Sequence, residues 1–130
     1  MKSSLDAKGF REHMGALGYN VSETEKPEYD TGINYLVASK EGVNYTVEYY
    51  EFDEEVEAKK VYEKYKKDIK SYITSTSNNN ETKGALFAKT IAKSENEYVV
   101  ISRVRSTIIF IATTKEYTNE VDKLLEELGY

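Results

Sequence analysis

The chain has no cysteine and no tryptophan, and its 130 residues include one proline and one histidine. The absence of cysteine excludes disulfides, thiolate zinc sites and cysteine nucleophiles. It fits the cytosol and equally the exterior of a Gram-positive cell. The single histidine, His13, has no serine, cysteine or aspartate partner at the spacing of a catalytic triad. We therefore interpret His13 as a residue at the edge of a helix face rather than as a base or a metal ligand.

Long apolar runs are also missing. The two longest, at residues 99–101 and 108–112, are separated by Ser102, Arg103 and Arg105. Both fall far short of the ~20 apolar residues of a membrane helix. The first four residues lack the apolar segment of a signal peptide. The sequence thus predicts no direct membrane insertion of this domain, and an export signal or anchor would have to lie outside it.

Charge is abundant but mixed. Charged residues make up 32% of the chain, and the net charge is −5, which argues against a nucleic-acid partner. The lysines of the expected second helix alternate with Glu63 and Asp68, so we interpret them as a solvated face. A second group of charges is acidic and lacks the spacing of a calcium-binding loop; it comprises Glu23, Glu25, Glu28 and Asp30. We expect a solvated loop there, and no metal or other cofactor.

Hydrophobic spacing predicts three amphipathic helices. Phe10, Met14 and Leu17 follow one another at intervals of four and three residues, which places them on one helical face. We expect helices at residues 4–17, 53–73 and 115–128.

Alternation of apolar and polar residues predicts five strands between the helices. They are expected at residues 33–37, 43–52, 85–92, 98–104 and 107–113. The nearly continuous apolar stretch at 108–111 indicates a central strand that is covered on both faces. The polar segments 20–31 and 75–81 are expected to be loops.

These elements give the order αββαβββα in a single domain spanning residues 1–130. Short connections between neighbouring strands favour an antiparallel sheet. We therefore predict an α+β fold: a two-layer sandwich with a five-stranded antiparallel sheet and three helices packed mainly on one face.

The same tripeptide, Leu-Gly-Tyr, ends the first and the last helix, at residues 17–19 and 128–130. One interpretation is an internal duplication. The other, which we favour, is that both helices end in a cap that needs glycine followed by a hydrophobic residue.

Tyrosine is the most unusual component, with 12 residues against four phenylalanines. Exposed tyrosine rings stack on sugars or anchor protein partners; alternatively, tyrosine replaces phenylalanine at half-buried positions. Arg103 and Arg105 lie near a strand end, where they would bind a carboxylate or an anionic glycan, or pair with a neighbouring acid. The candidate binding surface comprises Tyr35, Tyr45, Tyr49, Tyr50, Tyr98, Arg103 and Arg105.

Four segments carry a resemblance to known domains: residues 10–19, 49–62, 99–111 and 124–130. They contain the Leu-Gly-Tyr helix ends, a Phe-Asp pair before an acidic turn, and the apolar strand pair. In these segments the chain resembles uncharacterised α+β domains of Gram-positive bacteria, which are usually exported and held by a lipid anchor or one membrane helix. The resemblance implies an extracytoplasmic location and brings no known activity or functional residues.

We therefore expect a non-enzymatic, envelope-facing domain that binds a protein or glycan partner. The alternative is a cytosolic regulatory or dimerising module, in which an exposed edge strand would join two copies as a homodimer. An enzyme would require a deep pocket with convergent polar groups of perturbed pKa.

Overall fold

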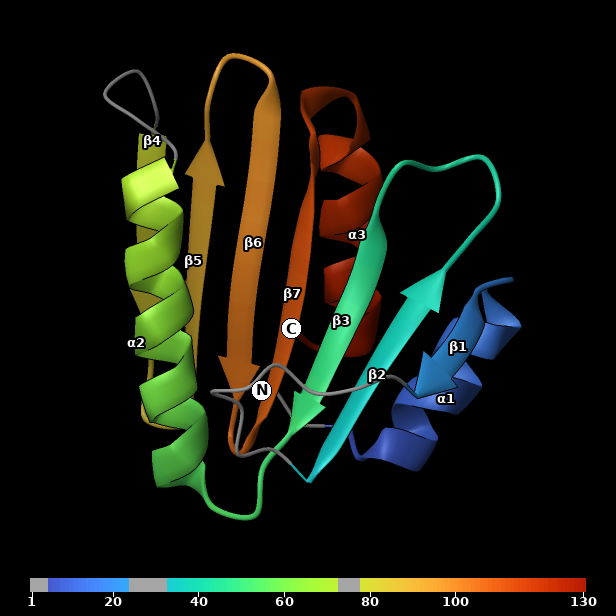
Figure 1. The fold of residues 1–130 in the computed structure, drawn as a ribbon, viewed down its shortest axis with the longest axis horizontal. Coiled ribbons are helices and arrows are strands. Elements are labelled where there is room, and N and C mark those ends of the chain that lie inside the picture. Colours follow the sequence, from blue (N-terminus) through green and yellow to red (C-terminus); the bar gives the residue numbers. More distant parts are fainter. Residues whose placement is uncertain (1–4, 24–32, 73–77) are drawn as a thin grey trace.

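The computed structural model describes residues 5–23, 33–72 and 78–130. Over these residues the chain forms one antiparallel sheet of seven strands and three α-helices (Figure 1). In chain order the elements are α1 (Ala7–Ala16), β1 (Asn20–Glu23), β2 (Asn34–Ser39), β3 (Thr46–Glu51), α2 (Glu55–Tyr72), β4 (Asn78–Lys83), β5 (Phe87–Lys93), β6 (Glu97–Val104), β7 (Thr107–Thr114), a 3₁₀ turn η1 (Lys115–Tyr117) and α3 (Thr118–Leu128).

The predicted five-stranded sheet and the order αββαβββα are wrong, because two polar segments expected to be loops contain strands. The observed order is αβββαββββα, and the strands lie side by side as β1-β2-β3-β7-β6-β5-β4. The two additional strands, β1 and β4, are the terminal strands of the sheet. Each pairs with one neighbour only, so backbone hydrogen bonds define it without any need for a buried apolar face.

The predicted two-layer arrangement is also wrong, because helices cover both faces of the sheet. Figure 1 shows α2 in front of the sheet and α3 and α1 behind it. The β6 strand explains the need for both layers: Tyr98 and Val100 face one core, whereas Val99 and Ile101 face the other. A strand that is apolar on both sides needs a helix on each.

The two cores divide the helices between them. The first core joins the apolar faces of α1 and α3 to the back of the sheet, with Phe10, Met14 and Leu125 fully buried. The second joins α2 to the front through residues such as Tyr62 and Ile69. The prediction of a central, doubly covered strand is confirmed: β7 is the fourth of the seven strands, and Ile108, Ile109 and Ile111 are at most 1% exposed.

Both Leu-Gly-Tyr tripeptides form the predicted helix caps. Gly18 and Gly129 have φ of 90° and 82°, the left-handed region that glycine adopts without strain. The amides of Tyr19 and Tyr130 donate to carbonyls five residues earlier, at 2.9 and 2.8 Å. This pattern is the Schellman motif. The caps account for the repeated tripeptide by local geometry alone.

Two features of the fold bear on where a ligand would bind. Among the described residues, no helix has both the length and the apolar character to cross a membrane. The start of α2, the β4–β5 turn and the end of β6 meet at one corner of the front layer, where they line a pocket.

Candidate functional site

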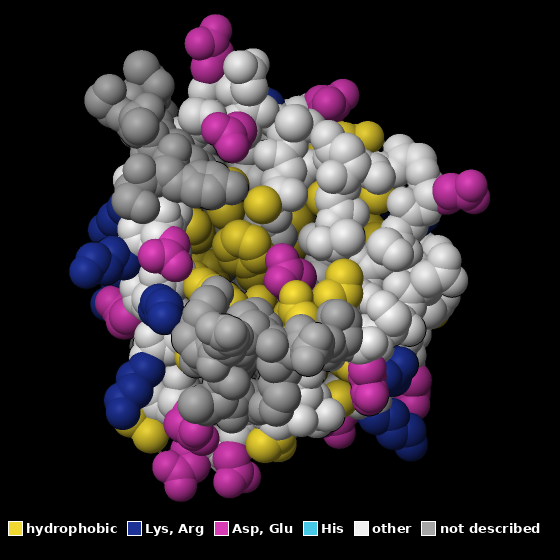
Figure 2. Space-filling view, viewed as in Figure 1, with side chains coloured by type: hydrophobic (Ala, Val, Ile, Leu, Met, Phe, Trp, Pro, Cys, Tyr) yellow, Lys and Arg dark blue, Asp and Glu magenta, His cyan; other side chains and the backbone are white. Residues whose placement is uncertain are grey.

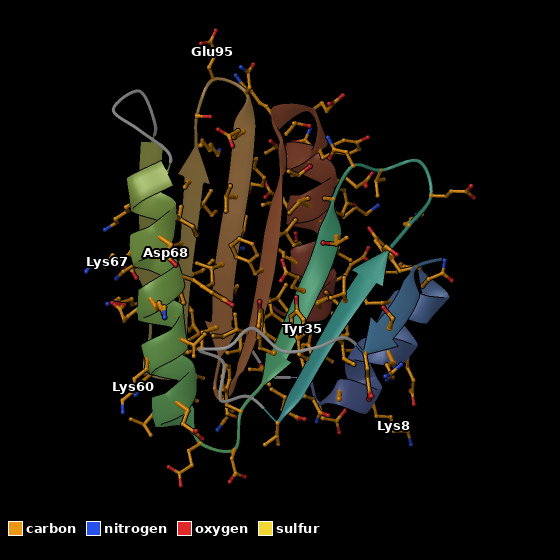
Figure 3. The ribbon with its side chains drawn as sticks, viewed as in Figure 1. Lys8, Tyr35, Lys60, Lys67, Asp68 and Glu95 are labelled. Carbon is orange, nitrogen blue, oxygen red and sulfur yellow. The ribbon has the colours of Figure 1, made fainter. Side chains whose placement is uncertain are left out.

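The tyrosines of the predicted binding surface do not gather at one surface. Tyr45, Tyr49 and Tyr98 belong to the first core and Tyr50 to the second, each at most 4% exposed. Tyr35, on β2 (Figure 3), is half-buried, and its hydroxyl group donates to Glu48 Oε1 at 2.7 Å. The structure therefore uses these tyrosines at core positions, with their hydroxyl groups satisfied at the rim.

The two arginines of that surface have different environments. Arg103 lies on β6 with 4% of its surface exposed. Arg105 lies in the β6–β7 turn, is exposed, and has φ of 53°. The two residues meet through the backbone, because Arg103 Nη1 donates to the carbonyl oxygen of Arg105 at 2.8 Å.

Arg103 is a buried charge with almost no compensation. Its Nε is shielded from solvent and has no hydrogen-bond partner, and no carboxylate of the described residues lies within 4.0 Å. Burial lowers the pKa of the guanidinium, and the negative charge of Glu55 on α2 opposes this effect. An isolated buried charge lowers the stability of the folded state by roughly several kcal/mol, unless a counter-charge or hydrogen bonds replace the lost water. Among the described residues, Arg103 therefore lacks a close counter-charge that would compensate for its burial.

A pocket of about 280 Å³ opens against Arg103. It lies between α2, the β4–β5 turn, β5 and β6. Its lining residues are Lys59, Tyr62, Glu63, Lys83, Gly84, Ala85, Phe87, Ala88 and Arg103. Three cations from three different elements thus share one pocket with a single acid.

The acids near the pocket are already compensated, by Lys66. Its Nζ lies 2.8 Å from Glu63 Oε1 and 3.1 Å from Glu81 Oε2, and hydrogen bonding to Glu63 raises the pKa of Lys66. Burial would raise the pKa of Glu81, but hydrogen bonds from Tyr62 and Lys66 outweigh it, and the net pKa lies below the usual value. Both carboxylates therefore lie beside a cation, and the lowered pKa keeps that of Glu81 ionised.

The remaining cations have weak or no partners among the described residues. Lys83 Nζ is 3.9 Å from Glu81 Oε2, with 58% of its side chain exposed. Lys59 is exposed and forms no ion pair there. Figure 2 shows lysine and arginine side chains gathered along the side of the molecule where α2 lies. Lys60 and Lys67, also on α2, point away from the sheet (Figure 3).

Close packing fixes the wall of the pocket at the β4–β5 turn. A Cβ atom on Gly84 would lie 2.2 Å from Cε1 of Phe87, so only glycine allows the ring to rest on this backbone. The Gly84 amide donates to the Phe87 carbonyl at 2.9 Å, and the Arg105 amide donates to the Leu86 carbonyl at 2.7 Å. The two turns that flank Arg103 are thereby joined.

Two other pockets, each of about 230 Å³, lack a comparable feature. The first contains Tyr98, whose hydroxyl group donates to Asp122. The second contains Glu120, which accepts a hydrogen bond from Tyr45. The Tyr98 hydroxyl group and the Glu120 carboxylate are thus already hydrogen-bonded, whereas Nε of Arg103 has no partner among the described residues.

The other candidates from the sequence give no site. Among the described residues, no group of three or more His, Asp or Glu side chains is placed to hold a metal ion. His13 is exposed on α1, and Glu23 pairs with Arg11 at 3.2 Å. The other acids of the predicted solvated loop, Glu25, Glu28 and Asp30, lie outside the described residues.

Comparisons with known proteins give no information about the function of this site. No protein-family model matches the chain, and neither the curated proteins nor the solved structures searched give a match.

Proposed function

We propose that this domain binds a ligand through an anionic group held in the pocket beside α2, with Arg103 as the principal recognition residue. The observation that carries the proposal is the burial of Arg103, which is 4% exposed; among the described residues its Nε has no partner and its Nη1 makes one backbone hydrogen bond. An anion at Nη2 would add a charge-assisted hydrogen bond and neutralise the buried charge.

The local charge supports the same function. The chain as a whole carries −5, yet three cations with weak or no acidic partners among the described residues, Lys59, Lys83 and Arg103, line one pocket. Such a local reversal of sign attracts anions and raises their local concentration. The volume, about 280 Å³, lies near the lower limit of ligand pockets at roughly 300 Å³. It suits a small ligand or one anionic group of a larger one, such as an anionic glycan or an acidic protein segment.

The proposed role is binding rather than catalysis, in a location outside the cytoplasm. The support for binding is that the uncompensated groups in the pocket are all fixed or exposed cations, which recognise charge. The location rests on the resemblance to exported Gram-positive domains. Cell fractionation of the natural protein tests it, and recovery from the cytosol alone would overturn it.

The binding experiment compares two arginines that differ in burial. Amide chemical shifts of the ¹⁵N-labelled protein are followed during titration with sulfate, phosphate and acetate. We expect saturable shifts around residues 84–88 and 103–105. Arg103→Met should weaken the binding by at least ~10-fold, because a hydrogen bond to a charged group contributes about 1.5–3 kcal/mol.

Arg105→Met is the matched control, because Arg105 is exposed and only its backbone carbonyl contacts Arg103. This variant should bind as the wild type does. Arg103→Met should remain folded, since an apolar replacement of a poorly compensated buried charge is often neutral or stabilising. Unchanged binding in a folded Arg103→Met variant, or the absence of saturable binding in the wild type, would overturn the proposal.

A further inference from the structure

Arg103 cannot bind a ligand through the edge of the guanidinium that contains Nε. A carboxylate is held best by the side-on fork formed by Nε and one Nη. In this structure Nε is shielded from solvent, and Nη1 already donates to the Arg105 carbonyl. Among the described residues, Nη2 and the second N–H of Nη1 have no hydrogen-bond partner and are not shielded as Nε is, so they are the donors left for a ligand. Arg103 therefore offers a ligand one end of the guanidinium rather than the fork.

The three cations reach the pocket from different elements of the fold. Lys59 comes from α2, Lys83 from the end of β4, and Arg103 from β6. Lysine ammonium groups act as point charges without a preferred plane. Three separate donors of this kind match an anion whose oxygens diverge in space, whereas the two oxygens of a carboxylate lie in one plane.

The hydrogen-bonding capacity of the pocket favours a fully ionised ligand. The Tyr62 hydroxyl group is used by Glu81 and Thr90, at 2.8 and 2.5 Å. The carboxylate of Glu63 is held by Lys66 at 2.8 Å. The donors that remain available are the cations Lys59, Lys83 and Arg103, which favour ligand oxygens that carry negative charge.

From this donor set we infer that the anionic group is a phosphomonoester, a tetrahedral dianion. The inference rests on the proposed function and narrows it to one ligand class. Three cations balance a dianion better than the single charge of a carboxylate or a sulfate ester. The rings of Phe87 and Tyr62 and the methyl groups of Ala85 and Ala88 line the rest of the pocket and would contact the body of the ligand.

The test uses three ligands with the same ring: phenyl phosphate, phenyl sulfate and benzoate. Isothermal calorimetry on the wild-type chain should show phenyl phosphate binding at least ~10-fold more tightly than the other two, about 1.4 kcal/mol. Arg103→Met should abolish this preference, and Arg105→Met should retain it. Equal affinities for the three ligands would overturn the phosphate assignment and leave the anion-binding function standing. No saturable binding of any of them would overturn both.

A second readout uses the second ionisation of the phosphate, near pH 6. Affinity for phenyl phosphate should rise several-fold between about pH 5 and pH 7 as the dianion forms, with no such rise for phenyl sulfate. The charged side chains around the pocket are Glu55, Lys59, Glu63 and Lys66 on α2, Glu81 and Lys83 on β4, and Arg103 on β6. None is a histidine, so a rise confined to phenyl phosphate comes from the ligand; an equal rise for both ligands would contradict the inference.

The phosphate could be carried by a soluble molecule or by a lipid. Glycerol phosphate and vesicles containing phosphatidic acid, each compared with its phosphate-free counterpart, distinguish the two sources. If either one binds and Arg103→Met weakens that binding, the result supports recognition of a phosphomonoester. It also shows whether the phosphate belongs to a soluble molecule or to a lipid. Binding of neither, with phenyl phosphate also inactive, overturns the inference.

Discussion

The hydroxyl group of Tyr62 donates a 2.8 Å hydrogen bond to Oε2 of Glu81, and this bond joins α2 to the terminal strand β4. Lys66, one helical turn along α2, reaches the same carboxylate at 3.1 Å. Since β4 has a strand on one side only, these side-chain bonds supplement its pairing with β5. They also hold this acid near the proposed phosphate site, since Lys83, which lines that pocket, has its Nζ 3.9 Å from Glu81 Oε2.

This contact predicts that the free energy of unfolding depends on pH in the acid range. The pKa of Glu81 is lowered in the folded protein from an ordinary value of 4.5, so its contribution is complete above that pH. It is lost as the pH falls through the folded-state pKa, because the unfolded chain then takes up the proton first. Glu81→Gln should therefore be less stable near neutral pH by ~1 kcal/mol and should lose less stability on acidification. Urea unfolding at a series of pH values measures this, and parallel pH profiles for variant and wild type would contradict it.

The buried tyrosines predict a coupled transition at high pH. Burial raises the pKa of Tyr45, Tyr49, Tyr50, Tyr62 and Tyr98. The neutral phenol is therefore favoured in the folded state, and its contribution is complete below about pH 10. Above that pH the unfolded chain loses its phenolic protons first, so stability falls as the pH rises.

The measurement is an alkaline titration that follows tyrosinate absorbance and circular dichroism together. Most of the absorbance change should coincide with the loss of ellipticity. The denatured chain in urea is the control, and its tyrosines should titrate near pH 10. A full absorbance change near that pH with an intact dichroism spectrum would contradict the prediction.

The sequence predicted the elements that bury apolar side chains and missed those that do not. Phe10 and Met14 fall at helical spacing, and residues 108–111 show the pattern of a central strand, so both are readable locally. The polar sequence of β4, Asn-Asn-Asn-Glu-Thr-Lys, has no apolar alternation. Its strand conformation comes from pairing with β5, a relationship that hydrophobic periodicity does not record.

The number of layers was missed for a related reason. Alternation along β6 was visible, but which helix covers which face depends on connections between distant segments. The site was found only in part. Arg103 was a candidate because a charge interrupts an apolar strand, whereas Lys59 looked like any other lysine of the solvated face of α2. Its contribution depends on the β4–β5 turn, which brings Lys83 and Gly84 beside it.

Gly84 gives a prediction about the pocket wall. Gly84→Ala places a Cβ atom 2.2 Å from Cε1 of Phe87, so the ring or the turn must move. We expect a loss of stability of about 1–3 kcal/mol and weaker binding of phenyl phosphate. Gly15→Ala on α1 is the matched control, because no described atom outside the neighbouring helix backbone lies within 4 Å of the added methyl group. It should stabilise the helix by about 0.5–1 kcal/mol. Chemical denaturation measures both, and a Gly84→Ala variant as stable as the wild type would show that the turn adapts freely.

Lys66 provides the sharpest prediction, because it does not line the pocket and yet should control its affinity. Replacement by methionine leaves the carboxylates of Glu63 and Glu81 without the cation that lies 2.8 and 3.1 Å from them. Their negative charge then acts on a bound anion with less compensation. Binding of phenyl phosphate by Lys66→Met should weaken by up to about fivefold, equivalent to ~1 kcal/mol.

Lys67→Met removes the same charge from the neighbouring position of α2, where the side chain points away from the sheet (Figure 3). It should leave the affinity nearly unchanged and thereby controls for net charge. The double variant Lys66→Met with Glu63→Gln should recover part of the lost affinity, because it removes one of the two uncompensated carboxylates. Equal weakening by Lys66→Met and Lys67→Met would mean that affinity follows net charge alone, and that the pairing of Lys66 with the two acids has no part in it.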